Sequence, residues 1–210
     1  MIFIFNESLV LFGTYMLYYL IEFLYGGITM ELIQLVDDSI ITFIHDNLHT
    51  LILDKIMIFI TSLGNSGIIW IAITFLFLLF RQTRKLGVLL ALSLLLELFL
   101  CDGVLKNIFA RPRPFTRFDV DLLISPPHSY SFPSGHTASS FTAAFVIYHY
   151  EKKLGIYAII LASFIGFSRI YLFCHYPSDV LGGIILAALI AAFTIYACNF
   201  YEAKFRKNNH

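Results

Sequence analysis

The chain has 210 residues and no formal net charge; 59% of its residues are hydrophobic and only 13% are charged. Soluble globular domains carry about twice that share of charged residues, so the composition excludes an ordinary soluble domain and indicates an integral membrane protein. The balanced charge gives no long-range field that would attract nucleic acid. The three cysteines lack the spacing of a zinc site or a disulfide framework, and nothing in the sequence indicates a cofactor or a partner protein.

The first 29 residues form a hydrophobic extension. They are apolar from Leu9 to Tyr25 but have neither a positively charged start nor a small-residue cleavage site. This pattern disfavours a removable signal peptide. We predict that residues 1–29 form an additional membrane segment, with Met30 as an alternative natural start.

Residues 30–210 are predicted to form a single domain that begins with an amphipathic helix. Between Glu31 and Asp46, apolar residues recur at the spacing of one helix face, and acidic residues occupy the other face. The polar face contains no lysine or arginine. We therefore expect this helix to pack against the other helices or to lie at the membrane interface, and not to bind anionic lipid.

Six apolar segments follow, each of roughly membrane-spanning length. They predict an all-α, polytopic membrane protein with a core of six transmembrane helices. The first two segments are short and are separated by Gly64-Asn65-Ser66-Gly67, a turn signal that predicts a tight helical hairpin. The segments are residues 51–63, 67–80, 86–109, 135–150, 154–173 and 180–200.

Basic residues outside these segments predict the orientation in the membrane. Clusters at residues 81–85, 152–153 and 204–207 all fall on one side of a six-segment core, and positive charge in short loops favours the cytoplasmic side. The proline-rich loop of residues 111–133 then lies on the opposite side. That side also carries basic residues, against the usual preference, which indicates that they bind an anion. We expect a plasma membrane protein whose active site faces the extracytoplasmic side.

The first polar motif on that face runs from Lys106 to Pro114. Arg113 has a proline on either side, and its planar guanidinium matches the oxygens of a phosphate, while a lysine supplies a compact charge. The alternative for Lys106 is that its side chain merely reaches the interface and pairs with Asp102, one helical turn earlier.

The second motif is Phe132-Pro133-Ser134-Gly135-His136, directly before an apolar segment. Ser134 is a preferred N-cap residue, and Gly135 allows an anion to approach the backbone N–H groups at a helix start. His136 could give a proton to a leaving group. Taken alone, the motif is better explained as an ordinary helix cap with a structural histidine than as part of an active site.

The third motif, Ser168 to Asp179, places charged groups in an apolar context, where they are costly and usually functional. Arg169 could complete a phosphate clamp. Asp179 lies four residues after His175 and could accept the hydrogen of one ring nitrogen, leaving the other nitrogen as a nucleophile. His175 could instead bind a metal, but no further ligands occur in a pattern such as HExxH.

Together, the three motifs resemble the signature of the type 2 phosphatidic acid phosphatase family. The resemblance covers residues 106–179 by motif and, through the helical core, most of the chain from about residue 31. The matching positions are Lys106 with six residues before Arg113-Pro114, then Pro133-Ser134-Gly135-His136, then Ser168-Arg169 with five residues before His175 and three more before Asp179.

The resemblance implies a metal-independent phosphatase that hydrolyses lipid phosphates or pyrophosphates through a phosphohistidine. By matched position, His175 is the nucleophile, Asp179 orients it, and His136 is the general acid. Arg111 and Arg117 lie outside the signature and are candidate contacts of a second phosphate or a head group. The residues expected to hold the phosphoryl oxygens are Lys106, Arg113, Ser134, Gly135 and Arg169.

The substrate that the resemblance favours is undecaprenyl pyrophosphate, with phosphatidylglycerol phosphate and phosphatidic acid as alternatives. Two other classes of protein remain open. A vanadium-dependent haloperoxidase shares the constellation, because vanadate can occupy the phosphate clamp. A transporter or scaffold could bind the lipid phosphate without hydrolysis, but binding alone needs no nucleophile, so His175, Asp179 and His136 favour an enzyme.

Overall fold

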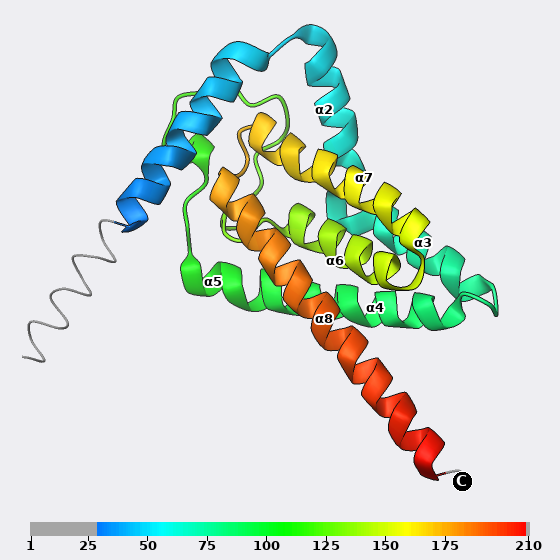
Figure 1. Ribbon diagram of the computed structural model, residues 1–210. Coiled ribbons are helices and arrows are strands. Elements are labelled where there is room, and N and C mark those ends of the chain that lie inside the picture. Colours follow the sequence, from blue (N-terminus) through cyan, green and yellow to red (C-terminus); the bar gives the residue numbers. More distant parts are fainter. Residues whose placement is uncertain (1–28, 209–210) are drawn as a thin grey trace, which may run out of the picture. The chain divides into compact units, whose positions relative to one another are not determined.

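The structure is a computed structural model that describes residues 29–208 (Figure 1). The predicted N-terminal membrane segment therefore lies outside the described residues, apart from its last position. Residues 29–48 form one helix, as the periodicity of the sequence predicted. The chain divides at Ile40 into two compact units, and the second unit, Ile41–His210, contains all the features described below.

Within the described part of the chain all regular structure is helical, which confirms the all-α class. A 3₁₀ turn, Asn65–Gly67, separates α2 from α3, and a π-helical turn, Phe99–Leu105, separates α4 from α5. The proline-rich loop after α5 contains one 3₁₀ turn, Pro114–Thr116. The helices are α2 (Leu51–Leu63), α3 (Ile68–Leu79), α4 (Arg84–Leu98), α5 (Lys106–Phe109), α6 (Gly135–Tyr150), α7 (Lys152–Tyr171) and α8 (Pro177–Asn208).

The first two predicted segments form a bent pair and not a hairpin. The axes of α2 and α3 differ by 47°, whereas a hairpin would reverse the direction of the chain, so the hairpin prediction is wrong. Ser66 and Gly67 have positive φ angles of 51° and 64°, which interrupt the helix before it resumes at Ile68. Turn residues thus marked the break correctly, but they do not distinguish a bend from a reversal.

The predicted count of six transmembrane helices is not confirmed. Within residues 29–208, three helical stretches are long and apolar enough to cross a membrane, namely Arg84–Thr116, Lys152–Tyr171 and Pro177–Lys204, and the bent pair α2–α3 would be a fourth. α6 has 16 residues, or about 24 Å at the usual helical rise, which is shorter than a hydrocarbon core of about 30 Å. Merging α2 and α3 removes one reversal ahead of all three basic clusters, so it does not change the sides of the clusters relative to one another.

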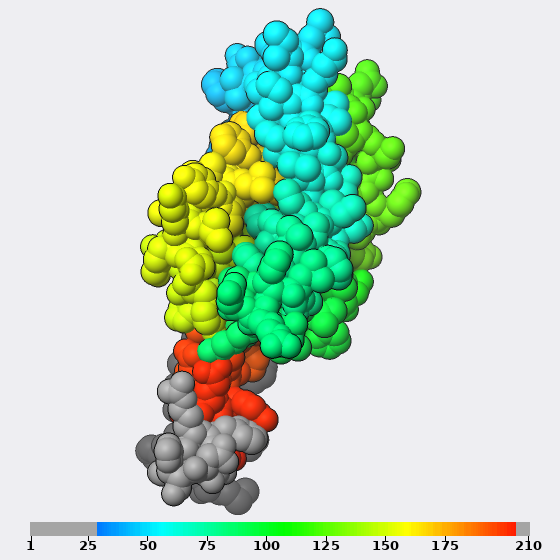
Figure 2. All heavy atoms as spheres, turned by 90° about the vertical axis from the view of Figure 1, so that its right-hand side faces the viewer, coloured from blue at the N-terminus to red at the C-terminus, as the bar shows by residue number. Residues whose placement is uncertain are grey.

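α6 is the central helix of the second unit (Figure 1). It contacts α3, α4, α7 and α8, and ten of its 16 residues are buried. Small side chains such as Ala138, Ala143 and Ala144 let the neighbouring helices approach closely. Figure 2 shows α2, in cyan, at the surface between α7, in yellow, and the loop after α5, in green. The first turn of α6, which carries Gly135 and His136, is therefore held from several sides.

The contact between Trp70 and Ser140 provides a test of this packing. Trp70 Nε1 donates a hydrogen bond of 2.8 Å to Ser140 Oγ, and both side chains are fully buried. Replacing Ser140 with alanine leaves a buried N–H without its acceptor, so the free energy of unfolding in detergent should fall by about 1–3 kcal/mol. The double variant Trp70→Phe/Ser140→Ala should lose less than the sum of the two single variants. A Ser140→Ala protein with the thermal stability of the wild type would contradict this account.

Candidate active site

A cavity of about 1190 Å³ lies among α2, α3, α4 and the first turn of α6. Apolar side chains of α2, α3 and α4, including Ile58, Ile71 and Leu94, form part of its wall. The cavity thus combines a cationic region that contains two histidines with an apolar region. Of the predicted site residues, it is lined by Lys106, Arg113, Gly135, His136, Arg169 and His175.

Lys106 follows a π-helical turn, a feature that is frequent at functional sites. Its Nζ donates to the Asp102 carboxylate and lies 3.4 Å from Ser129 Oγ. The predicted pairing of Lys106 with Asp102 is therefore confirmed. Lys106 is nevertheless buried and lines the cavity. Gly135 lies against the pair, since a Cβ at this position would stand 3.4 Å from Lys106 Nζ.

Arg113 connects the loop after α5 to the predicted nucleophile. Its Nε donates to the Ser129 carbonyl at 2.6 Å, and its Nη1 donates to the Cys174 carbonyl at 2.9 Å. The same Nη1 lies 3.1 Å from His175 Nε2. Because a guanidinium group can only donate, Nε2 must accept, and the proton of the neutral ring is on Nδ1.

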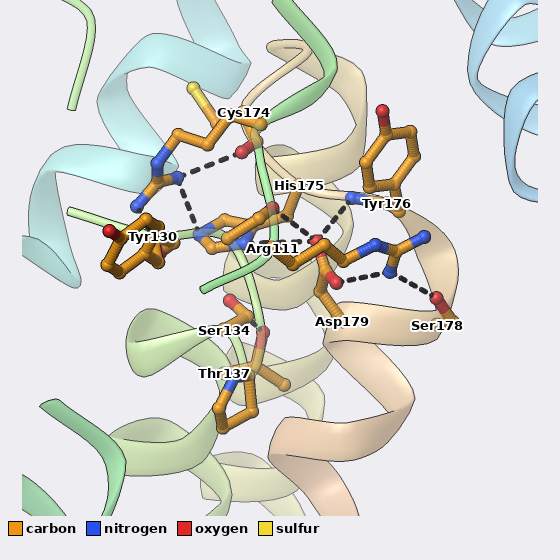
Figure 3. Close-up of polar contacts among 12 residues, drawn as sticks. Arg111, Tyr130, Ser134, Thr137, Cys174, His175, Tyr176, Ser178 and Asp179 are labelled. Carbon is orange, nitrogen blue, oxygen red and sulfur yellow. Dashed lines mark hydrogen bonds and ion pairs between the residues drawn. The ribbon is translucent and has the colours of Figure 1, made fainter. Parts of the chain in front are cut away.

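His175 lies in the segment between α7 and α8 and is 1% exposed. Its Nδ1 is 3.5 Å from Asp179 Oδ2 (Figure 3), a separation longer than a normal hydrogen bond, and makes no hydrogen bond with the described residues. Burial lowers the pKa of His175 to about 3, with Asp179 opposing and Arg113 reinforcing the effect. The imidazole is therefore neutral near pH 7, and Nε2 carries a lone pair.

Asp179 is fully buried, and its carboxylate accepts several hydrogen bonds (Figure 3). Oδ1 accepts from Arg111 Nη1 at 2.5 Å, while Oδ2 accepts from Ser131 Oγ at 2.5 Å and from the Tyr176 N–H at 2.9 Å. A carboxylate with this many donors stays ionised and keeps one orientation. Asp179 is thus held near His175 Nδ1, and its role in orienting the ring stays a prediction.

Arg111 lies behind Asp179 and does not line the cavity. Besides Asp179, its Nη1 donates to Ser178 Oγ at 2.7 Å, and its guanidinium stacks 4.2 Å from the centre of the Tyr176 ring. Arg117 also lies outside the cavity lining, with Nη1 3.4 Å from Tyr176 Oη. Neither arginine lines the cavity, and their role as contacts of a second phosphate or a head group stays a prediction.

Ser134 is the N-cap residue of α6, as predicted, but its side chain makes no capping hydrogen bond. Its hydroxyl accepts from Thr137 Oγ1 at 2.9 Å, and its N–H donates to the Asp179 carbonyl at 3.1 Å. Ser134 is fully buried outside the cavity lining. A Cβ at Gly183 would stand 2.9 Å from the Ser134 carbonyl, so this glycine lets α8 bring Asp179 against the turn.

Arg169 reaches the cavity from the last turn of α7. Its Nη1 donates to Thr61 Oγ1 of α2 at 2.6 Å, and its buried Nε has no hydrogen-bond partner among the described residues. A buried guanidinium with an uncommitted N–H can accommodate an anion. Arg169 therefore fits the predicted role of a phosphate ligand.

His136 contacts the break between α2 and α3. Its Nε2 lies 2.9 Å from Asn65 Oδ1. Sequence reasoning assigned Asn65 to a turn and missed this contact, although a polar residue between two apolar segments was a usable signal. Sequence reasoning also missed Ser131 and Thr61, the partners of Asp179 and Arg169, for which neither periodicity nor spacing gives any signal.

The arrangement suits phosphoryl transfer. A neutral nitrogen of His175 faces a cavity that also contains three cationic side chains and a second histidine. Fixed cations stabilise the negative charge spread over a transferring phosphoryl group, which is the main contribution that proteins make to this reaction.

The comparisons with known proteins agree with this chemistry. An undecaprenyl-diphosphatase from Sulfolobus acidocaldarius is 34% identical over 145 residues, which cover 68% of this chain and 69% of that protein. The undecaprenyl-diphosphatase BcrC from Bacillus subtilis is 30% identical over 142 residues, or 68% of this chain and 73% of that protein.

Among solved structures, the crystal structure of a transmembrane PAP2 type phosphatidylglycerolphosphate phosphatase from Bacillus subtilis superposes with a TM-score of 0.68. It has 27% sequence identity and covers 87% of this chain and 94% of that chain. Residues 85–202 match the PAP2 superfamily. This match extends over more than half of the 210-residue chain. The chain therefore belongs to the PAP2 superfamily, as its three motifs indicated, and is a membrane phosphatase that hydrolyses lipid phosphate esters.

Proposed function

We propose that this phosphatase converts undecaprenyl pyrophosphate to undecaprenyl phosphate on the extracytoplasmic side of the plasma membrane. The observation that carries the proposal is the single cavity whose lining joins Lys106, Arg113 and Arg169 to apolar side chains of α2, α3 and α4. Such a cavity suits a molecule with an anionic head and a hydrocarbon chain. The two related undecaprenyl-diphosphatases support the choice of lipid.

A second candidate substrate is phosphatidylglycerol phosphate. The similarity to the phosphatidylglycerolphosphate phosphatase of Bacillus subtilis favours it, and the same cavity suits a diacyl lipid. Phosphatidic acid would undergo the same chemistry. These substrates differ in the leaving group, which is a lipid phosphate for undecaprenyl pyrophosphate and an alcohol for the two monoesters.

The mechanism we propose has two steps. His175 Nε2 attacks the terminal phosphorus, the bond from phosphorus to the lipid oxygen breaks, and His136 gives that oxygen a proton. Water then attacks the phosphohistidine, His136 takes up a proton, and phosphate leaves. Lys106, Arg113 and Arg169 stabilise the phosphoryl oxygens in both steps.

The free site must rearrange before the first step. Arg113 Nη1 lies 3.1 Å from His175 Nε2, so it occupies the lone pair that attacks phosphorus. A phosphoryl oxygen would draw this N–H away and release Nε2. Asp179 meanwhile accepts the Nδ1 hydrogen and stabilises the positive charge that develops on the ring.

Replacement of His175 with alanine should abolish turnover, because no other group in the cavity lining is positioned to take its place. The measurement is the release of inorganic phosphate from a panel of lipid phosphates by purified protein in detergent. The same panel ranks the substrates and separates an enzyme from a lipid binder. Appreciable residual activity in His175→Ala would contradict the nucleophile assignment.

The reaction should also need no metal ion. Within residues 29–208, no cluster of three His, Cys, Asp or Glu side chains has the arrangement of a metal site. In the proposed mechanism the nucleophile and the cations that stabilise the phosphoryl oxygens are all side chains of this protein, so phosphate release should persist in EDTA. A loss of activity that zinc or magnesium restores would overturn this part of the proposal, and halide oxidation with peroxide would instead indicate haloperoxidase chemistry.

Arg111 should act by orienting Asp179. The variants Arg111→Lys and Arg111→Gln should lower kcat by about tenfold to hundredfold, since small displacements of catalytic groups have effects of this size. KM should change little, and any change should be the same for monophosphates and diphosphates. A KM that rises for diphosphates alone would show that Arg111 binds a second phosphate. Arg117→Gln is the matched control, because Arg117 contacts Tyr176 Oη and not the Asp179 carboxylate in the described contacts.

The orientation can be tested by labelling two engineered cysteines in intact cells. Asp121 in the loop after α5 and Lys153 at the start of α7 are both exposed. Asp121→Cys should react with an impermeant maleimide from outside, and Lys153→Cys should react only after the cells are opened. The reverse pattern would place the active site on the cytoplasmic side.

A further inference from the structure

The break between α2 and α3 is an unusual feature for a membrane-spanning pair. Non-helical backbone at membrane depth leaves N–H and C=O groups without helical partners, so it is tolerated only where it is buried in protein or lines a cavity. Here the break lines the catalytic cavity, through all four of its residues from Gly64 to Gly67. The position of the break next to the site calls for a functional explanation.

The break brings one polar side chain to the general acid. Asn65 Oδ1 lies 2.9 Å from His136 Nε2, and because an amide oxygen only accepts, Nε2 must carry a hydrogen. The approach depends on Gly64, where a Cβ would stand 2.8 Å from His136 Cδ2 and 2.9 Å from Ile165 Cγ2. The backbone at Gly64 and the side chain of Asn65 therefore both contact the His136 ring.

His136 needs such a partner because of its burial and the charges around it. A general acid must be protonated when the leaving group departs, yet burial, together with the cations required for phosphate binding, lowers the pKa of His136 to about 2. An acceptor at Nε2 favours the protonated ring. The titratable and charged groups that line the cavity with His136 are Lys106, Arg113, Arg169, His175, Glu97 and Asp102.

We propose that Asn65 positions His136, the general acid. Asn65 accepts the Nε2 hydrogen of His136, so the proton that reaches the leaving oxygen comes from Nδ1. As the phosphorus to oxygen bond breaks, the electron pair goes to the lipid oxygen, the Nδ1 proton joins it, and His136 becomes neutral. The water that attacks the phosphohistidine returns a proton to Nδ1. This inference rests on the proposed function, in which His136 is the acid.

The proposal makes the effect of Asn65 depend on the leaving group. An alkoxide is a strong base and needs a proton as it leaves, whereas a nitrophenolate is stable without one. Loss of Asn65 should therefore slow the hydrolysis of an alkyl phosphate and spare that of an aryl phosphate. A residue that merely holds the fold or binds phosphate would affect both substrates alike.

The experiment measures kcat and KM for decyl phosphate and 4-nitrophenyl phosphate with purified protein in detergent. For Asn65→Ala, we expect kcat on decyl phosphate to fall about tenfold to hundredfold and kcat on 4-nitrophenyl phosphate to stay within about threefold, since general acid catalysis contributes factors of this order. Asn65→Asp should restore decyl phosphate hydrolysis and move the alkaline limb of its pH profile upward, because a carboxylate holds the imidazolium proton more strongly.

Two control variants separate the possible outcomes. Ile68→Val shortens an exposed side chain that lies three positions after Asn65 and does not line the cavity, so it should keep the wild-type ratio of the two rates. His136→Ala should show the same selective loss as Asn65→Ala.

Equal losses on both substrates in Asn65→Ala, with a selective loss in His136→Ala, would overturn the role of Asn65 and leave His136 as the general acid. Without a selective loss in His136→Ala, the general acid assignment itself fails. If Asn65→Ala does not fold, an unshifted alkaline limb in Asn65→Asp overturns the proposal.

Discussion

The site depends on keeping one buried carboxylate in place. A charge taken out of water must find donors within the protein, and Asp179 has no exposed surface. Its donors come from segments far apart in the sequence, namely Arg111 and Ser131 at the two ends of the proline-rich loop and the Tyr176 N–H before α8. Satisfying this one charge brings the three motifs of the sequence together.

The cationic groups of the cavity are also largely paired in the free protein. Lys106 contacts Asp102, Arg113 donates to carbonyl groups and to His175, and Arg169 donates to Thr61. These contacts keep the cationic groups near the cavity without substrate, which limits the reorganisation that electrostatic catalysis requires. They also mean that a phosphate must displace internal partners, and burial of a hydrocarbon chain can supply the free energy for this exchange. The apolar wall of the cavity thereby favours lipid phosphates over inorganic phosphate.

How much the sequence could predict depended on the range of each interaction. The pair Asp102–Lys106 follows from local spacing, because residues four apart share one helix face. His175 and Asp179 have the same spacing, but His175 precedes α8, so their approach depends on the turn between α7 and α8. The contact from Arg111 to Asp179 joins residues 68 apart in the chain, and no periodicity encodes it. The hairpin prediction failed for a related reason. The residues at Gly64–Gly67 specify an interruption, while packing against α6 and α7 decides the direction in which the chain continues.

Three strained positions show how the fold aims its functional groups. Among the described residues, the non-glycine residues with positive φ are Ser66, Ala110 and Phe173, and each such conformation costs roughly 1–3 kcal/mol. Ser66 follows Asn65, Ala110 precedes the segment of Arg111 and Arg113, and Phe173 precedes His175 by two positions. Each one ends or interrupts a helix beside the site. A regular helix would continue each row of side chains along its axis, whereas a left-handed residue turns the chain within one step and changes the direction of the polar groups beside it. The strain is therefore located where the geometry of phosphoryl transfer requires side chains that regular helices would not deliver.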